Sequence, residues 1–326
     1  MPQPSISYAC GRVGVLRRTA LRHAQLDRLL AAHDFPEAVR TLTDIGFAAT
    51  DGFDFQMIAD HHVEKACRLI KAVTPEPDVT DCFLFRYDAH NLKVLIKSRH
   101  LAQKPQFLSA CGTLSVDRLR HCVADHTYGP LPAQFRIAME ALEKRLAVKF
   151  DPMLVDTELD KAMYRQIFEN LSHSRDAATA ITYFRAKADL QNAVMLLRLK
   201  AMGKDAVFFQ SIALPGGNAP AKALSIAFAE PDKLNKLLQR YGAKVCQAAQ
   251  DAAQDAARLP FLEKTADDYL YGLFRPYRYD SASLEILIAY LLTMQREATD
   301  VRLIMAGKLN GFQPDAVTER MRELHG

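Results

Sequence analysis

The stretch FRYDAHNLKVLIK, residues 85–97, decides the fold class, because it recurs in altered form twice further along the chain. The second copy is FRAKADLQNAVMLLR at residues 184–198, and the third is REATDVRLIMA at residues 296–306. Each copy has an acidic residue, a polar amide or acid three positions later, and then an apolar run with basic residues. A spacing of three places both polar side chains on one face of a helix. The stretch therefore predicts three related helices.

Successive copies of this stretch are about one hundred residues apart, measured between Asp88, Asp189 and Glu297. Such regular spacing predicts pseudo-symmetric units that stack and bury faces no single unit can bury alone. We expect three units with these bounds: residues 1–112, 113–218 and 219–326. The loops between predicted helices are short, so we expect the units to pack as one rigid body.

Apolar residues recur at helical spacing along almost the whole chain, and few segments have the pattern of strands. The predicted fold class is therefore all-α. Residues 13–32, followed by a restart at Asp34 with Pro36 in its first turn, predict a helical hairpin. Further helices are predicted at residues 54–72, 82–99, 116–125, 133–147, 158–171, 176–202, 232–258, 262–274, 281–306 and 314–324.

Composition and charge narrow the classes of function. Hydrophobic residues make up 49% and charged residues 25% of the 326 residues, which excludes a disordered chain. The formal net charge of +4 comes from 42 basic and 38 acidic residues, and the two signs alternate along most segments. Because no block of lysines and arginines could follow a phosphate backbone, nucleic acid is not expected as a partner.

The cysteines and the apolar stretches bear on where the chain works. Six cysteines are scattered without a CxxC pair, and the N-terminal MPQPSISYACGRVGV lacks the pattern of a signal peptide. These features predict a reducing cytoplasm. The longest apolar stretch, residues 283–294, contains Glu285 and is shorter than the about 20 residues that cross a bilayer. We therefore expect a chain that does not span a membrane by itself.

The polar pairs of the repeated stretch are the first candidates for chemistry. Glu297 and Asp300 could serve acid–base catalysis or metal binding, but the other two copies have an amide in place of the second acid. We therefore interpret the pairs as structural, with the acid meeting a nearby arginine and the amide satisfying backbone groups. The nearby arginines are Arg86, Arg185 and Arg296.

Other clusters give weaker signals. The histidines and cysteines within residues 61–67 and 121–126 lack the spacing of helical or zinc-finger metal ligands. The Gly-Lys pairs at residues 203–204 and 307–308 lack the earlier glycine of a phosphate-binding loop and are interpreted as helix ends. No nucleophile has a recognisable partner. We expect no catalytic residue, cofactor, metal or small-molecule substrate.

The repeated stretch, taken with YACGRV at residues 8–13, resembles the C subunit of the V/A-type rotary ATPases, called the d subunit in eukaryotic V-ATPases. The resemblance follows the whole chain. Its most specific parts are YFRAKADLQN at residues 183–192 and REATDVRLIMAGKLNGF at residues 296–312. The third copy departs from the family's Glu-x-x-Asn-Ile-Arg pattern in having Asp300 and Val301.

The resemblance implies three helical units packed as a funnel-shaped socket on the membrane c-ring, at the cytoplasmic face of the cell membrane. The mouth of the socket would receive central axle subunits of the D and F type. The chain would transmit torque between ATP turnover in the catalytic head and transport of H+ or Na+ by the ring, without being an enzyme itself. Such a connector needs stiffness and wide interfaces, which interlocked helices supply.

Basic residues of the repeat helices are the candidates for partner contacts by analogy with the family: Arg185, Lys187 and Arg302. The alternative for these side chains is ion pairing within the chain. Two other functions stay open. A free-standing helical scaffold for another protein would fail to copurify with a ring and an axle, and an enzyme would need a pocket with perturbed carboxylates.

Overall fold

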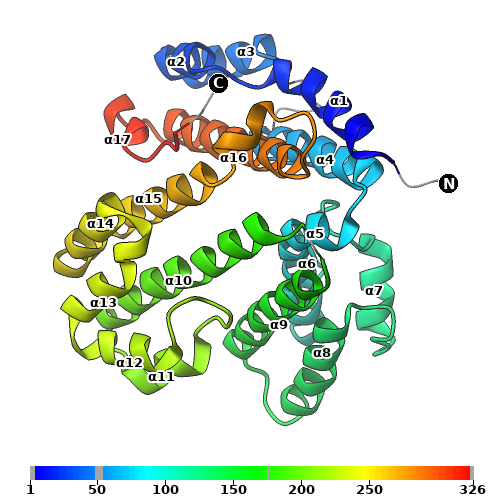
Figure 1. The fold of residues 1–326 in the computed structure, drawn as a ribbon, viewed down its shortest axis with the longest axis vertical. Helices are drawn as coiled ribbons and strands as arrows, with labels where there is room; N and C mark the ends of the chain where they lie inside the picture. The colour runs from blue at the N-terminus through cyan, green and yellow to red at the C-terminus, as the bar shows by residue number, and fades with distance from the viewer. Residues whose placement is uncertain (1–3, 48–53, 175, 324–326) are drawn as a thin grey trace. The chain divides into compact units, whose positions relative to one another are not determined.

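A computed structural model describes residues 4–47, 54–174 and 176–323 (Figure 1). Every regular element within these residues is a helix, which confirms the predicted all-α class. The chain groups into two compact units: unit 1 contains Met1–Glu76 and Pro260–Gly326, and unit 2 contains Pro77–Leu259. This grouping follows packing rather than sequence repetition, so the division into three repeat units stays a prediction.

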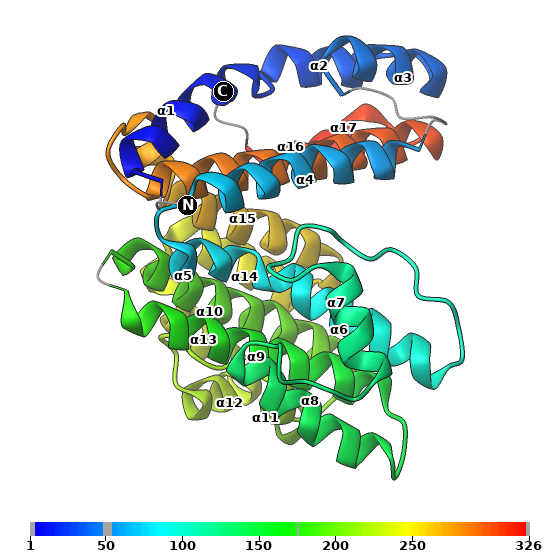
Figure 2. The same ribbon diagram turned by 90° about the vertical axis from the view of Figure 1, so that its right-hand side faces the viewer.

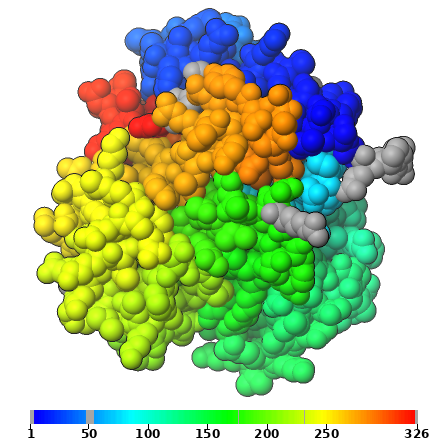
Figure 3. All heavy atoms as spheres, viewed as in Figure 1, coloured from blue at the N-terminus to red at the C-terminus, as the bar shows by residue number. Residues whose placement is uncertain are grey.

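Unit 1 is assembled from two segments that lie far apart in the sequence. Its helices are α1 (Ile6–Leu16), α2 (His23–Ala31), α3 (Phe35–Asp44), α4 (Phe55–Val73), α15 (Leu259–Gly272), α16 (Glu285–Leu309) and α17 (Pro314–Thr318), with short 3-10 helices η1 (Arg17–Thr19) and η5 (Arg275–Tyr279). The helices α4 and α16 lie side by side over much of their length (Figures 1 and 2). The segment around η5, orange in Figure 3, lies at the surface of this unit.

The core of unit 1 joins its N-terminal helices to its last long helix. Leu29 of α2 and Leu42 of α3 are fully buried, and they pack in one cluster with Val301, Ile304 and Met305 of α16. Burying an aliphatic side chain of this size stabilises the fold by about 1.5–3 kcal/mol. The two sequence segments therefore depend on each other for their buried surface.

Unit 2 is one continuous segment. Its helices are α5 (Pro77–Thr80), α6 (Phe85–His100), α7 (Val116–Ala124), α8 (Ala133–Leu146), α9 (Pro152–His173), α10 (Ala178–Ala201), α11 (Ala206–Ile212), α12 (Ala221–Ala229), α13 (Pro231–Leu238) and α14 (Ala243–Gln254), with η2 (Asp81–Phe83), η3 (Gln239–Tyr241) and η4 (Ala256–Arg258). The helix α9 packs against α6, α8 and α10. The ring of Phe83 lies 4.8 Å from that of Phe184 and 5.2 Å from that of Tyr183. These aromatic contacts connect η2, just before α6, with α10.

Sequence signals explain where several helices begin. Asp34 caps α3 by accepting a hydrogen bond from the backbone N–H of Glu37, and Pro36 lies in the first turn as predicted. Asp151 caps α9 and Asp205 caps α11 in the same way. An N-cap of this kind contributes about 1 kcal/mol, because it satisfies an amide that has no partner inside the helix.

The structure corrects three of the predicted helices. The helix predicted at residues 314–324 is shorter, because α17 ends at Thr318. Residues 13–32 do not form one helix, because η1 separates α1 from α2. Residues 232–258 do not either, because Gly242 has a φ of 94° between η3 and α14, a backbone conformation that no helix can contain. The short helices α11 and α12 were not predicted.

Candidate functional site

The acid in the first copy of the repeated stretch binds the backbone of a later loop. Asp88 of α6 is buried, and its carboxylate accepts hydrogen bonds from the backbone N–H groups of Thr113 and Leu114 at 2.8 and 3.2 Å. The loop can approach this closely only because residue 112 is glycine, since an added Cβ would lie 2.2 Å from Asp88 Oδ1. We call this arrangement of acid, loop amides and close approach an acid node.

The second copy forms the same acid node. Asp189 of α10 accepts hydrogen bonds from the backbone N–H groups of Asn218 and Ala219 at 2.9 and 3.0 Å. The hydroxyl of Tyr241 donates a further hydrogen bond to Asp189. Gly217 provides the close approach here, because a Cβ at this residue would lie 2.0 Å from Asp189 Oδ1.

The third acid node is closed by the N-terminal part of the chain. Glu297 of α16 is fully buried and accepts a hydrogen bond from the backbone N–H of Leu21 at 2.8 Å, across 276 sequence positions. Its other oxygen lies 2.9 Å from His62 Nε2. No glycine precedes Leu21 in this loop, where the sequence is Thr19-Ala20, but glutamate reaches one methylene further than aspartate. In all three nodes the bound amide lies two residues before a short helix, α7, α12 or α2.

The amide of the repeated stretch binds the same loops. Asn91 donates from Nδ2 to the backbone carbonyl of Ser109 at 2.8 Å and accepts from the backbone N–H of Ser109 at 2.8 Å. Asn192 makes the same two bonds with Leu214, at 2.9 and 2.8 Å. The predicted role of the amides, satisfying backbone groups, is confirmed at both positions.

The predicted arginine partners of the acids are wrong for Asp189. Among the described residues, its hydrogen bonds come from backbone amides and a tyrosine. Arg296 instead forms an ion pair with Asp268 of α15. The described part of the chain holds no cluster of three or more His, Cys, Asp or Glu side chains suited to a metal ion. The polar pairs therefore tie loops to helices.

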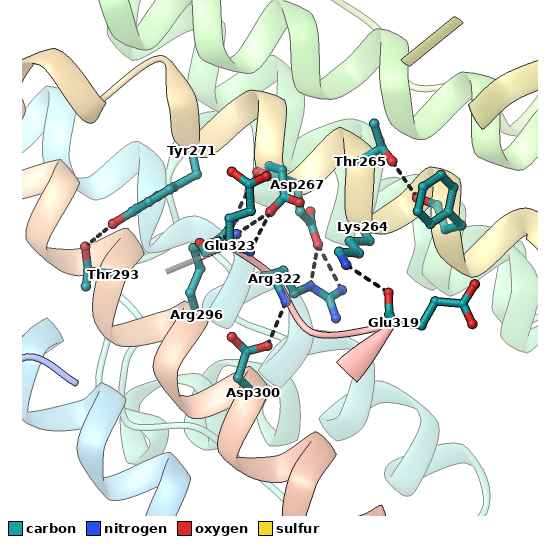
Figure 4. Close-up of polar contacts among 12 residues, drawn as sticks. Lys264, Thr265, Asp267, Tyr271, Thr293, Arg296, Asp300, Glu319, Arg322 and Glu323 are labelled. Atoms are coloured by element: carbon teal, nitrogen blue, oxygen red, sulfur yellow. Dashed lines mark hydrogen bonds and ion pairs between the residues drawn. The ribbon is translucent and has the colours of Figure 1, made fainter. Parts of the chain in front are cut away.

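Near the third node, the segment after α17 is tied to α15 and α16 by several polar bonds (Figure 4). Arg296 of α16 donates to the backbone carbonyl of Glu323 at 2.7 Å. The guanidinium of Arg322 pairs with Asp267 of α15 at 2.9 Å. Lys264 of α15 donates to the backbone carbonyl of Glu319 at 2.8 Å. We call residues 319–323 the C-terminal strap.

Arg185, one of the predicted partner-binding residues, lines a cleft of about 540 Å³ in unit 2. Arg165 of α9 lines the same cleft, and this second arginine was missed by the sequence analysis. Both side chains are exposed, and neither has a hydrogen-bond or ion-pair partner among the residues that the structure describes. The other lining residues are Gln134, Phe168, Leu171, Ser172, Ile181, Pro215 and Gly216. We call this the arginine cleft.

The second acid node shapes one wall of the arginine cleft. Gly216 lies in that wall and has a φ of 86°, and a Cβ there would lie 2.0 Å from the ring of Phe168. The next residue, Gly217, makes the close approach to Asp189. The Gly-Gly pair therefore holds one loop against both an aromatic side chain and a buried acid. Two cations beside apolar side chains form a surface that suits acidic groups of another molecule.

The two other predicted partner-binding residues are placed differently from Arg185. Lys187 is half-buried, and its ammonium group lies 5.4 Å from the centre of the Tyr183 ring. Arg302 forms an ion pair with Asp60 of α4 within unit 1. The arginine cleft therefore includes one of the three predicted residues.

Comparison with known protein families gives a match that spans almost the whole chain. The family described as ATP synthase (C/AC39) subunit matches residues 9–320, which include all three acid nodes and the arginine cleft. The chain belongs to this family. The resemblance predicted from the repeated stretch is thereby confirmed, and with it the expectation of a non-catalytic subunit of a rotary ATPase complex.

The curated relatives of this ATP synthase (C/AC39) subunit are also C subunits of V-type and A-type complexes. The C subunit of the V-type sodium ATPase of Enterococcus hirae is 24% identical over 284 residues, which are 84% of this chain and 84% of the relative. The C subunit of the A-type ATP synthase of Methanosarcina mazei is 24% identical over 257 residues, 73% of this chain and 68% of the relative. The corresponding A-type protein of Haloferax volcanii is 25% identical over 176 residues, 50% and 47% of the two chains. None of the described helices combines the length and apolarity that crossing a bilayer requires.

Proposed function

We propose that this chain is the central-stalk connector of a V/A-type rotary ATPase. The observation that carries the proposal is the family match over residues 9–320, supported by relatives named as the C subunit of V-type and A-type complexes. In this role the chain joins axle subunits of the D and F type to the membrane c-ring, at the cytoplasmic face of the membrane. It transmits torque between ATP turnover and transport of H+ or Na+.

The acid nodes support a mechanical role. Torque must pass through the chain without being absorbed by loops that bend. Each node fixes a loop to a long helix by charge-assisted hydrogen bonds, which are roughly twice as strong as neutral ones. Because the carboxylates are buried, water does not compete for these bonds. The arrangement therefore favours stiffness at three points where a helical protein would otherwise be soft.

The first test is reconstitution. The purified chain is mixed with the axle subunits and, separately, with detergent-solubilised c-ring, and co-elution is measured by size-exclusion chromatography. Binding to both partners supports the connector. A folded, helical protein that binds neither would contradict it and favour the alternative, a free-standing helical scaffold for another protein partner.

The arginine cleft is the proposed contact for acidic side chains of the axle. Arg165 and Arg185 present two charges, without partners among the described residues, beside the apolar side chains of Phe168 and Ile181. Such a pair steers and orients an acidic partner. Lys187 lies on the same helix as Arg185 and would add to the positive field. Arg302 would contribute less, because Asp60 already neutralises its charge.

Charge reversal tests the arginine cleft. The double variant Arg165→Glu and Arg185→Glu is expected to weaken axle binding at least about tenfold, because both charges then repel acidic groups. The matched control is Arg12→Glu with Arg40→Glu, two exposed arginines of unit 1 without partners among the described residues, which changes the net charge equally. Isothermal titration at two salt concentrations measures both. Equal losses in the two double variants would show a general charge effect and exclude the cleft.

A further inference from the structure

The amide position of the third copy differs chemically from the other two. Asn91 and Asn192 each use both ends of their amide on the backbone of one loop residue, with the nitrogen donating and the oxygen accepting. The third copy has Asp300 at this position. A carboxylate can accept the N–H, but it cannot donate to the carbonyl. One of the two bonds is therefore lost whenever Asp300 is ionised.

The structure contains the bond that a carboxylate can make and lacks the other. Asp300 Oδ1 accepts a hydrogen bond from the backbone N–H of Arg322 at 3.0 Å, as Figure 4 shows. Asp300 Oδ2 is buried and has no hydrogen-bond partner among the described residues. The whole residue is 0% exposed. A buried oxygen that accepts no hydrogen bond destabilises the ionised carboxylate and favours protonation of that oxygen.

We propose that Asp300 is a proton-binding site: the folded protein holds a proton on Oδ2, which donates to the backbone of the C-terminal strap as the Asn91 and Asn192 amides donate to their loops. The acceptor is the carbonyl of Arg322, the residue whose N–H the same side chain already binds. Protonation makes Asp300 a functional replacement for the asparagine. Loss of the proton leaves the strap with one bond fewer and sets a negative charge against a carbonyl oxygen.

The charged groups around Asp300 are engaged elsewhere. On its own helix, Arg296 pairs with Asp268 and binds the Glu323 carbonyl. On the strap, the Arg322 guanidinium pairs with Asp267 of α15. On α4, Asp60 pairs with Arg302, and His62 Nε2 lies 2.9 Å from Glu297. Within the described residues, no cation of these elements is thus committed to neutralising Asp300.

The balance of these effects favours the proton. Burial raises the pKa of Asp300 from 3.8 to about 6, although the Arg322 N–H and the charges of Arg296 and Arg322 lower it in part, and Asp268 raises it. An acid whose pKa is higher in the folded state takes up protons on folding. Stability from this site is therefore complete below about pH 4 and is lost as the pH rises through about 6. A rise in pKa of about two corresponds to about a hundredfold in the unfolding equilibrium constant.

The test compares Asp300→Asn with the wild type. The asparagine restores both bonds at every pH, so the variant should resist unfolding by urea more strongly than the wild type near pH 8, by up to about a hundredfold in the equilibrium constant. Near pH 5 the difference should fall to about tenfold, and near pH 4 to about two- to threefold. The difference between the two proteins at each pH removes the contributions of all other titrating groups.

Two further measurements separate this site from a general effect of the substitution. Hydrogen exchange of residues 319–323 should be faster in the wild type than in Asp300→Asn near pH 8, and the two rates should converge near pH 4. The matched variant Asn192→Asp should introduce a pH dependence of the same sign in unit 2. An Asp300→Asn protein that is no more stable than the wild type near pH 8, with unchanged exchange of the strap, would overturn the proposal. The test needs neither axle nor ring, so its outcome is independent of the connector role.

Discussion

At the scale of single residues, the sequence predicts that three acids pair with nearby arginines, but in the structure these buried acids bind backbone amides of loops. Asp88, Asp189 and Glu297 accept hydrogen bonds from backbone amides of loops that pack against their helices. A hydrogen bond to a charged group contributes about 1.5–3 kcal/mol, roughly twice a neutral one. Removing one acid leaves several donors unsatisfied at once.

Asp189→Ala is expected to lower the free energy of unfolding by about 3 kcal/mol, because the amides of Asn218 and Ala219 and the hydroxyl of Tyr241 all lose their acceptor. Urea unfolding followed by circular dichroism measures the change. The exposed Asp27→Ala serves as control and should stay within about 0.5 kcal/mol of the wild type. Axle affinity of the folded variant should change far less than its stability. An equally stable variant that lost only axle binding would contradict the structural role.

At the scale of elements, each long repeat helix is joined to the loop that returns to it. Gly112 and Gly217 allow their loops to approach Asp88 and Asp189 closely. The third copy has no such glycine, but its acid, Glu297, is longer by one methylene. The same loops lead into α7 and α12, so a displaced loop would also displace the short helix that follows it. Helix and loop therefore form one mechanical element in each copy.

Gly217→Ala is expected to cost about 2–3 kcal/mol of stability, because the new methyl group would overlap Asp189 Oδ1 and force the loop away from the acid. The matched control is Gly129→Ala, also in unit 2, where a Cβ would meet no atom within 4 Å. Thermal unfolding of the two variants side by side measures the difference. Equal melting temperatures would show that the loop relaxes freely and that the close approach is not needed.

At the scale of the whole molecule, the two compact units are built differently. Unit 2 is continuous in sequence and has its own aromatic and aliphatic core, including Phe83, Phe135 and Phe184. Unit 1 needs both of its segments, because the apolar faces of α2 and α3 are buried against α16. The third acid node, between Leu21 and Glu297, ties the same two segments together.

A fragment of residues 77–259 is accordingly expected to fold alone, with a helical spectrum and a cooperative urea transition. Residues 1–76 alone should lack a cooperative transition, because the core partners that α16 supplies are missing. Co-expression of 1–76 with 260–326 should restore one, and the two pieces should copurify. A cooperative transition in isolated 1–76 would show that unit 1 does not depend on its C-terminal segment.

Much of the fold follows from local pattern. Apolar spacing predicts most of the long helices, and Asp34 with Pro36 predicts the start of α3, because caps and amphipathic faces depend on residues within one or two turns. The break at residues 17–22 is missed, because helical propensity continues through it. The break at Gly242 is missed, because an isolated glycine does not by itself show where a helical pattern ends.

The sequence by itself determined the all-α class, the family, and the fact that each acid shares a helical face with an amide or a second acid, since these depend on short-range spacing. The tertiary structure decided which groups those side chains bind. Asp189 meets a loop about thirty residues away and Glu297 meets Leu21, while Arg185 has no partner among the described residues and Arg302 is paired with Asp60. Such contacts depend on how loops return to the helices, because a hydrogen bond needs its two atoms about 3 Å apart and local sequence carries no measure of that distance.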